Sequence, residues 1–545
     1  MDHRLLPARL PLILFLLLTA IAAGRIVSTY RSISQTSDEC SNLACGMEWL
    51  DRGRYELGPF HPPLARIAMS IGPYLDGARS QGLTDRWREG NAVLSSARRY
   101  ARTLTLARIG ILPFFVLAAA CVWLWSRRLL GDWGGVLAVF LFSNIPPVLA
   151  HAGVATSDMA IGAGLSAAAY AFVRWVDEPD LRRSLLLGAA LAAAFLSKFS
   201  SVVLLPACVI TILLLRRTGS SPARRQVVIA LTVAALFVWA AYRFSFGHMT
   251  EHVAEDAAGQ GGIWARIPSS WLHALERAPL PAPRILDGFW QVHNHVEGGH
   301  AAYLLGHNST RGWWYFFPVA LGVKTPLGLL ILTAIGFLAL ARQKLRPFDW
   351  QAWAPAALLL VVLLVCMPST LNIGVRYALP LYPMMAITAA AGAVYLFRRP
   401  LGGVLAAALL LWTAASSLAA HPDYLAYFNE IAGSRPERFL VDSDLDWGQD
   451  MKQLASALKQ RKVTNFHLAA LYSGDYALVD LPPWDDLKPY QPVTGWVAVS
   501  FTMLKTYSWL VAQQAGRSDL GFAWLDRYQP VARVGKSFLL YRIPE

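Results

Sequence analysis

The chain has 545 residues, of which 55% are hydrophobic and 15% are charged, and its mean hydropathy is +0.38. A soluble protein of this size does not need so much apolar surface, so the composition predicts a polytopic membrane protein. The formal net charge is +14, but the basic residues alternate along the chain as membrane topology requires, which argues against a nucleic-acid partner.

Hydropathy predicts about eleven membrane-spanning helices, at roughly 8–24, 105–126, 133–151, 159–175, 185–197, 200–215, 226–244, 314–340, 352–367, 377–396 and 402–419. The first apolar run ends in small residues before Arg25, like a signal peptide, but its length favours an uncleaved anchor. Basic residues gather in alternate turns between these helices; they include Arg4, Arg9, Arg127, Arg128, Arg174, Arg182, Arg183, Arg216, Arg217, Arg224, Arg225, Arg342, Lys344, Arg346, Arg398 and Arg399. The positive-inside rule therefore predicts a multi-pass inner-membrane protein with a cytoplasmic N-terminus.

Three segments are then expected on the outer face. Two are loops of a transmembrane module at 1–420, namely 25–104 and 245–313. The third, 421–545, has the composition of a soluble domain and alternates between strand and helix patterns. We expect strands at Phe439–Val441, 466–472, 496–501 and a hairpin of 531–534 with 537–543, and a helix at Gln449–Gln460. These elements predict a small extracytoplasmic α/β domain.

The first outer loop contains the most informative polar residues. Asp38 and Glu39 are consecutive carboxylates directly after the first apolar helix. A carboxylate at the membrane surface is costly to bury, so it is either solvated or functional. Asp38 has the position expected of a general base, whereas Glu39 points elsewhere and should differ in role. His61 is followed by Pro62 and Pro63, which fix an extended backbone or simply begin the next helix.

Three further charges lie at predicted outer ends of helices. Asp158 is either a helix cap or a second active-site carboxylate. Lys198 occupies a tight turn, where it either snorkels or binds a lipid phosphate. Arg376 is the only positive charge in its predicted outer turn. Because the positive-inside rule disfavours a cation there, an anionic ligand is its natural partner.

Two other patterns are weaker. Cys40 and Cys45 lie on the outer face, where they either form a disulfide or stay as free thiols. The histidine-rich segment 293–300 and the acidic segment 442–450 contain metal-ligand residue types, but neither has a recognised spacing. In the acidic segment a turn before the helix, with Asp446 as its cap, is the simpler interpretation. A divalent metal therefore has little support.

In this order and on this topology, the motifs resemble bacterial phospholipid-carrier-dependent glycosyltransferases. These are similar to protein O-mannosyltransferases and aminoarabinose lipid A transferases (glycosyltransferase family 39-like), and the family has the GT-C membrane fold. The resemblance covers residues 8–450 and rests on Asp38-Glu39, His61-Pro62-Pro63-Leu64, Thr156-Ser157-Asp158, Ser197-Lys198-Phe199, 312–315 with Lys324-Thr325-Pro326, and Arg376-Tyr377 with Pro380. The segments 421–429 and 442–450 resemble a subgroup with an extra outer domain.

The resemblance implies an inverting glycosyltransferase that moves a monosaccharide from a polyprenyl-phosphate donor to a hydroxyl of a protein, lipid or glycan acceptor. It implies that Asp38 activates the acceptor hydroxyl and that Arg376 and Lys198 bind the donor phosphate. We further predict that Asp158 orients the acceptor or a catalytic water, and that Glu39, among the catalytic residues, and His61, on the donor-phosphate side, shape the site. No nucleotide or redox cofactor is required. The alternatives are a lipid-linked-sugar transporter or flippase, an oligosaccharide ligase or polymerase, and an assembly subunit. A transporter predicts functional charges at mid-membrane, whereas these candidates lie at one face.

Overall fold

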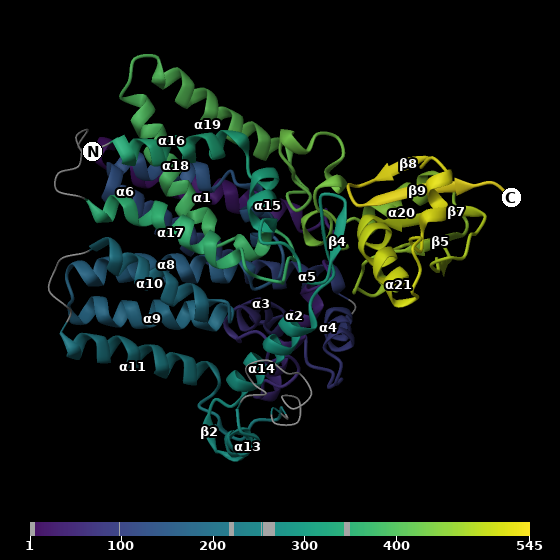
Figure 1. Cartoon of the computed structure of the whole chain (residues 1–545), viewed down its shortest axis with the longest axis horizontal. Helices are drawn as coiled ribbons and strands as arrows, with labels where there is room; N and C mark the ends of the chain where they lie inside the picture. The colour runs from purple at the N-terminus through teal and green to yellow at the C-terminus, as the bar shows by residue number, and fades with distance from the viewer. Residues whose placement is uncertain (1–5, 97–98, 217–222, 252, 254–266, 343–348) are drawn as a thin grey trace.

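The computed structural model describes residues 6–96, 99–216, 223–251, 253, 267–342 and 349–545. Four of the basic residues that indicated topology, Arg4, Arg217, Lys344 and Arg346, lie outside the described residues. Apolar helices run side by side along the molecule, and a small sheet domain at the C-terminus lies at one end of them (Figure 1). The shorter helices α2 to α5 gather at that same end.

In the part of the chain that the structure describes, thirteen helices overlap the predicted apolar segments. They are α1 (Leu6–Thr29), α5 (Tyr100–Ile109), α6 (Leu112–Phe142), α7 (Pro146–Ala152), α8 (Asp158–Asp177), α9 (Leu181–Ser197), α10 (Ser201–Arg216), α11 (Arg224–Ala241), α15 (Phe316–Lys324), α16 (Leu327–Arg342), α17 (Trp350–Cys366), α18 (Leu381–Phe397) and α19 (Gly402–Ala419). Among the described residues, five helices are long and apolar enough to cross a membrane, or six if α15 and α16 form one bent span. The helices α10, α17 and α18 are apolar but shorter. The predicted spans thus correspond to helices, but among the described residues only five or six helices are long and apolar enough to cross a membrane by themselves.

Two breaks interrupt the bundle. Gly131 has φ 78° and ψ 178° inside α6, a conformation that glycine adopts without steric cost, and it separates the two spans predicted there. The predicted single span 314–340 is instead two helices, α15 and α16, bent by 117°. The cause is Pro326, because the residue before a proline is driven out of the helical region, and Thr325 accordingly has φ −104° and ψ 136°.

The two outer loops are built from short elements. The first contains α2 (Glu39–Met47), a π-helical turn (Glu48–Arg52), α3 (Leu64–Leu75) and α4 (Arg86–Ser95). The second contains α13 (Ser269–Arg277), α14 (Arg284–Gly298) and two antiparallel pairs, β1 (Phe246–Gly247) with β2 (Leu280–Pro281) and β3 (Ala302–Leu304) with β4 (His307–Ser309).

The C-terminal domain contains a five-stranded mixed sheet in the order β6-β5-β7-β9-β8. Its elements are α20 (Met451–Gln460), β5 (Phe466–Ala469), β6 (Trp484–Asp486), β7 (Gly495–Ser500), α21 (Ser508–Gln514), β8 (Ala532–Val534) and β9 (Phe538–Ile543). The strands β5, β6 and β7 are parallel, and β9 pairs antiparallel with β7 and β8. The predicted strand at Phe439–Val441 is wrong, because Phe439 donates its N–H to Pro436 in a turn. The domain boundary at 420 stays a prediction.

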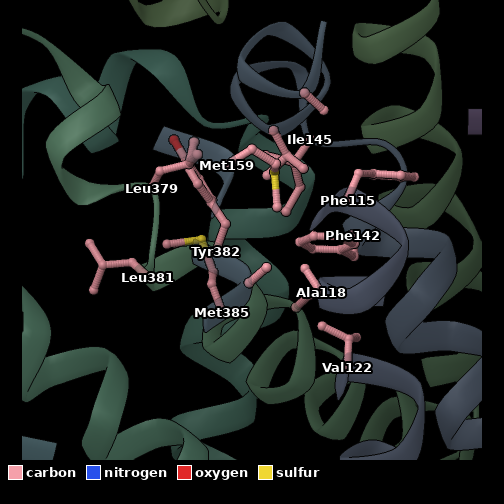
Figure 2. Close-up of a cluster of buried hydrophobic side chains, with 14 of the residues drawn as sticks. Phe115, Ala118, Val122, Phe142, Ile145, Met159, Leu379, Leu381, Tyr382 and Met385 are labelled. Atoms are coloured by element: carbon pink, nitrogen blue, oxygen red, sulfur yellow. The ribbon is translucent and has the colours of Figure 1, made fainter. Parts of the chain in front are cut away.

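A buried apolar cluster fixes the start of α18 against α6 and α8 (Figure 2). Phe115 stacks on Phe142 with ring centroids 5.7 Å apart, and Met159, Leu379 and Tyr382 are buried beside them. The short 3-10 turn η4 (Val375–Ala378) directly precedes Leu379. Close packing of this cluster therefore limits the movement of the turn that carries Arg376.

Candidate active site

Asp38 and Arg376 meet at the end of the bundle that faces the C-terminal domain. Asp38 precedes α2, and its side chain makes no capping hydrogen bond to that helix. The carboxylate is therefore free to face η4, where Arg376 Nη1 donates to Asp38 Oδ2 over 2.6 Å. The Asp38 side chain is 34% exposed and that of Arg376 is 11% exposed. This pair joins residues 338 positions apart in the sequence.

A second carboxylate and a second cation adjoin this pair. Lys198 Nζ donates to Asp158 Oδ1 over 2.7 Å, and both side chains are nearly buried. Asp158 Oδ2 lies 3.9 Å from Arg376 Nη1, which links the two pairs. The N-cap of α8 is Ser157, so the alternative role of Asp158 as a cap is wrong. Lys198 Nζ lies 4.1 Å from the ring centroid of Tyr377 and does not snorkel.

The four predicted residues thus form one continuous group in which carboxylates and cations alternate. They come from four separate places in the sequence, and their common location agrees with the shared sidedness inferred from topology. Burial alone would lower the pKa of Arg376, but Asp38 and Asp158 raise that pKa above its ordinary value, so Arg376 stays cationic. The group offers a partly exposed carboxylate next to fixed positive charge, which suits proton abstraction beside an anionic substrate.

Glu39 lies apart from this group, although it follows Asp38 directly. Its two carboxylate oxygens accept hydrogen bonds from Arg108 Nε and Nη2, each over 2.8 Å. They also accept from the backbone N–H groups of Thr36 and Ala155. Burial would raise the pKa of Glu39, but the Arg108 charge and these hydrogen bonds lower it overall. With every partner in place, Glu39 fastens α2 to α5 and to the loop before α8.

His61 lies in the extended loop before α3. Its carbonyl oxygen accepts from the Tyr55 hydroxyl over 2.7 Å, and the fully buried Arg66 donates to Tyr55 and to Asn42 of α2. Burial lowers the pKa of His61 well below its ordinary value, and the positive charges of Arg66 and Lys198 act in the same direction. His61 Nδ1 is buried without a hydrogen-bond partner among the described residues. The imidazole is therefore neutral and would meet a ligand as a hydrogen-bonding group.

The C-terminal domain reaches into the site through Trp447. The Arg376 guanidinium carbon lies 4.4 Å from the centroid of the Trp447 ring. The Trp447 carbonyl accepts from the backbone N–H of Ser37 over 3.0 Å, directly before Asp38. Trp447 therefore contacts Arg376 directly and supports Asp38 through the preceding residue, Ser37. The sequence reasoning did not single out Trp447, since no local pattern indicates a partner 410 positions away.

Further hydrogen bonds join the same two segments. The Ser34 N–H donates to the Gln449 carbonyl over 2.8 Å, and the Lys452 N–H donates to Ser34 Oγ over 2.9 Å. The Ser473 hydroxyl donates to the Ser37 carbonyl. These contacts define a seam between residues 34–37 and the C-terminal domain, and the seam sets the position of the residue that follows it, Asp38.

The acidic segment 442–450 supports the site rather than forming a second one. Asp444 accepts from the Val375 N–H over 3.0 Å, next to Arg376. Asp446 accepts from the Thr502 N–H over 2.8 Å, so its predicted role as the cap of α20 is wrong. Asp450, which precedes α20, accepts from the N–H and hydroxyl of Ser537. Each carboxylate therefore satisfies backbone donors that would otherwise be buried without a partner.

Two weaker predictions can be placed as well. Cys40 and Cys45 are free, buried thiols, and Cys40 Sγ lies 3.6 Å from Ser473 Oγ. The structure therefore has free thiols at Cys40 and Cys45, and the alternative of a disulfide between them is wrong. Across the described ranges, no group of three or more His, Cys, Asp or Glu side chains is arranged to hold a metal ion. His300 Nε2 lies 3.5 Å from Asp442 Oδ2, which joins the histidine-rich and acidic segments as an ion pair when His300 is protonated.

Comparison with known proteins identifies the fold. The family model described as dolichyl-phosphate-mannose-protein mannosyltransferase matches residues 103–242. No curated protein sequence matches this chain. The solved structure of archaeal oligosaccharyltransferase AglB from Archaeoglobus fulgidus, in complex with an inhibitory peptide and a dolichol-phosphate, aligns with a TM-score of 0.51 at 11% identity over 96% of this chain and 73% of that one.

Two further structures are similar. The apo form of the Archaeoglobus fulgidus oligosaccharyltransferase aligns with a TM-score of 0.50 at 14% identity, over 95% of this chain and 72% of that one. ArnT from Cupriavidus metallidurans, bound to undecaprenyl phosphate, aligns with a TM-score of 0.48 at 12% identity, over 96% and 97% of the two chains. The two oligosaccharyltransferase structures, with TM-scores of 0.51 and 0.50, show that the chain has the GT-C fold of membrane glycosyltransferases.

Proposed function

We propose that this protein is an inverting glycosyltransferase that moves a monosaccharide from a polyprenyl-phosphate donor to an acceptor hydroxyl. The observation that carries the proposal is the alternating group of Asp38, Arg376, Asp158 and Lys198. A partly exposed carboxylate adjoins two fixed cations at the end of an apolar bundle, where a lipid-linked phosphate would arrive. The matching family model is described by a dolichyl-phosphate-linked sugar, which has the same donor chemistry.

In the proposed reaction Asp38 accepts the proton of the acceptor hydroxyl. The acceptor oxygen forms a bond to the anomeric carbon from the side opposite the phosphate, and the bond from that carbon to the phosphate oxygen breaks. The electron pair stays on the departing phosphate, so negative charge develops there. Arg376 and Lys198 are cations positioned to stabilise this charge. His61, as a neutral imidazole, would contribute a hydrogen bond on the donor side.

Asp158 has a positioning role in this scheme. It holds Lys198 Nζ at 2.7 Å and lies 3.9 Å from Arg376 Nη1, so its negative charge offsets the repulsion between the two cations. A phosphate that enters between them then meets both cations at once. Glu39, with its oxygens occupied by Arg108 and backbone donors, acts through the placement of α2 and takes no proton.

We further propose that the C-terminal domain completes the site through Trp447. Its ring lies against the Arg376 guanidinium, and its carbonyl fixes Ser37. The aromatic face attracts the guanidinium and holds it in place without adding a third anion beside it. The domain thereby sets the spacing between the base and the phosphate-binding cation. In this proposal the site faces outward from the inner membrane, with the N-terminus in the cytoplasm and 421–545 outside.

The test is glycosyl transfer by the full chain in proteoliposomes supplied with a radiolabelled polyprenyl-phosphate monosaccharide and a membrane extract as the source of acceptors. We expect wild type to transfer label, and Asp38→Asn and Arg376→Ala to lose transfer while staying folded. Asp526→Asn replaces an exposed aspartate of the C-terminal domain and should behave as wild type. Movement of labelled lipid across the bilayer without transfer would overturn the proposal in favour of a transporter.

A further inference from the structure

A basic groove lies between the end of α1 and the C-terminal domain, apart from the Asp38 group. Its volume is about 430 Å³. Three segments line it: the turn after α1, the outward face of α20, and the turn between β8 and β9. The opposite face of α20, with Met451, Leu454 and Leu458, packs into the domain core. The face that borders the groove is therefore left for contacts outside the domain.

Each of the three segments contributes positive charge to the basic groove. Arg31 comes from the turn, Lys452 and Arg461 from α20 and its end, and Arg533 from β8. The described lining contains no aspartate or glutamate. Lys452 Nζ and Arg461 Nη1 donate to backbone carbonyl oxygens, while Arg533 pairs with Glu437 from outside the groove at 3.0 Å. Lys452 and Arg461 thus use one backbone contact each, and most of the positive charge in the groove is left uncompensated.

The position of the basic groove limits what can occupy it. The segment Arg9–Thr29 of α1 is long and apolar enough to span a membrane, and Arg31 follows it by two residues. The groove therefore lies where the hydrocarbon ends and the layer of lipid headgroups begins. Phosphate is the anion that is abundant at this level, and guanidinium groups bind its oxygens through paired hydrogen bonds.

We propose that the basic groove binds a phosphate group at the membrane surface. The shared chemistry is a phosphate monoester or diester whose oxygens would be bound by the cations that line the groove, Arg31, Lys452 and Arg461. The phosphate belongs either to an anionic phospholipid headgroup or to a soluble phosphate compound. This inference does not depend on glycosyl transfer, since it concerns charges that lie outside the proposed site.

The experiment compares wild type with the double variant Arg31→Gln and Arg461→Gln. Both side chains are exposed, so the fold should be kept, which thermal unfolding would verify. The matched control is Lys488→Gln with Arg527→Gln, which removes the same charge from exposed positions of the same domain. Retention of phosphatidylglycerol and of phosphatidylcholine by the detergent-solubilised full chain is measured by native mass spectrometry. In a second arm, inorganic pyrophosphate is titrated and the unfolding temperature is followed.

We expect the double variant to bind one of these phosphates about tenfold or more weakly than wild type and the control. Weaker retention of phosphatidylglycerol, with phosphatidylcholine unaffected, assigns the basic groove to an anionic headgroup. Loss of the pyrophosphate response alone assigns it to a soluble phosphate. The proposal is overturned if wild type, double variant and control are equal in both arms, or if the control loses as much as the double variant. If Arg31→Gln with Arg461→Gln proves unstable, the single change Arg461→Glu gives the same comparison.

Discussion

Two consecutive carboxylates have opposite environments in this molecule. Glu39 and Arg108 form a pair in which both side chains are 0% exposed, and backbone donors complete the coordination of Glu39. Asp38 and Arg376 form a pair in which Asp38 is 34% exposed, and within the described residues its other carboxylate oxygen accepts no hydrogen bond. The first pair is buried, and both of its carboxylate oxygens are already hydrogen-bonded, so its role is structural. The second leaves a carboxylate oxygen accessible, and this difference separates a stabilising ion pair from the one that we propose to be reactive.

The largest effect is expected from Asp38→Asn. Glycosyl transfer should fall by about 10²–10⁴-fold, because the amide cannot accept the acceptor proton. The unfolding temperature should fall less than in a Glu39 variant, because Asp38 is partly exposed and Arg376 keeps Asp158 as a second counter-charge. Transfer assays and thermal unfolding in detergent measure both quantities. A loss of stability as large as that of a Glu39 variant would erase the distinction between the two pairs.

Glu39→Ala should do the reverse. Removal of the carboxylate leaves Arg108 buried without its counter-charge, which should lower the free energy of unfolding by about 3–5 kcal/mol. Chemical or thermal denaturation of the solubilised protein would measure it. The double variant Glu39→Leu with Arg108→Met should recover part of the loss, because no buried charge is then left unpaired. Should Glu39→Ala keep wild-type stability and lose transfer, Glu39 belongs to the reaction.

The pH dependence of stability should differ between Glu39, whose carboxylate pairs with Arg108, and Asp450, whose carboxylate lies near a second acid, Asp423. Burial raises the pKa of Asp450 from 3.8 to about 7, and the nearby Asp423 acts in the same direction. The folded state then holds the proton more tightly than the unfolded state, so this contribution to stability falls as pH rises from about 4 to about 7. The lowered pKa of Glu39 has the opposite sign, because its contribution is present above its ordinary value of 4.5 and is lost as pH falls.

Asp450→Asn should therefore flatten the decline of the unfolding temperature of the C-terminal domain between pH 4 and pH 7. The exposed Asp526→Asn serves as the control and should leave the decline unchanged. Unfolding scans across this pH range test the sign. Stability that rises over the same interval in wild type, and loses that rise in Asp450→Asn, would contradict the assignment.

A smaller effect is expected from Trp447→Leu, which removes the ring beside Arg376. Cation–π contacts contribute about 0.5–2 kcal/mol, so transfer should fall by roughly 2- to 30-fold. A positioning role predicts that KM for the donor rises while the pH profile of transfer keeps its shape. Trp447→Phe should restore most of the activity because it keeps an aromatic face. Equal losses in the Leu and Phe variants would point to general disruption of the seam.

The sequence predicted Asp38, Asp158, Lys198 and Arg376 because topology placed them at one face, and the structure brings them into contact. It predicted that Glu39 differs in role from Asp38, but it did not predict the partner of Glu39, because Arg108 was counted within an apolar span. A lone arginine inside such a span is a signal of a buried counter-charge and would have identified the pair. The turn at Phe439 was misjudged because a short apolar run does not distinguish a strand from a buried turn. Trp447 required tertiary contacts that no local pattern encodes.

The seam between Ser37 and Trp447 joins residues 410 positions apart, and this separation has a consequence for biosynthesis. During translation, Asp38 emerges and enters the membrane with α1 long before the segment that fixes its neighbour has been made. The residues that would abstract a proton and bind a phosphate stay unassembled through most of synthesis. If the proposed site is correct, nascent chains stay inactive until the C-terminal domain folds, and truncation before Trp447 should give a protein that inserts in the membrane without transfer activity.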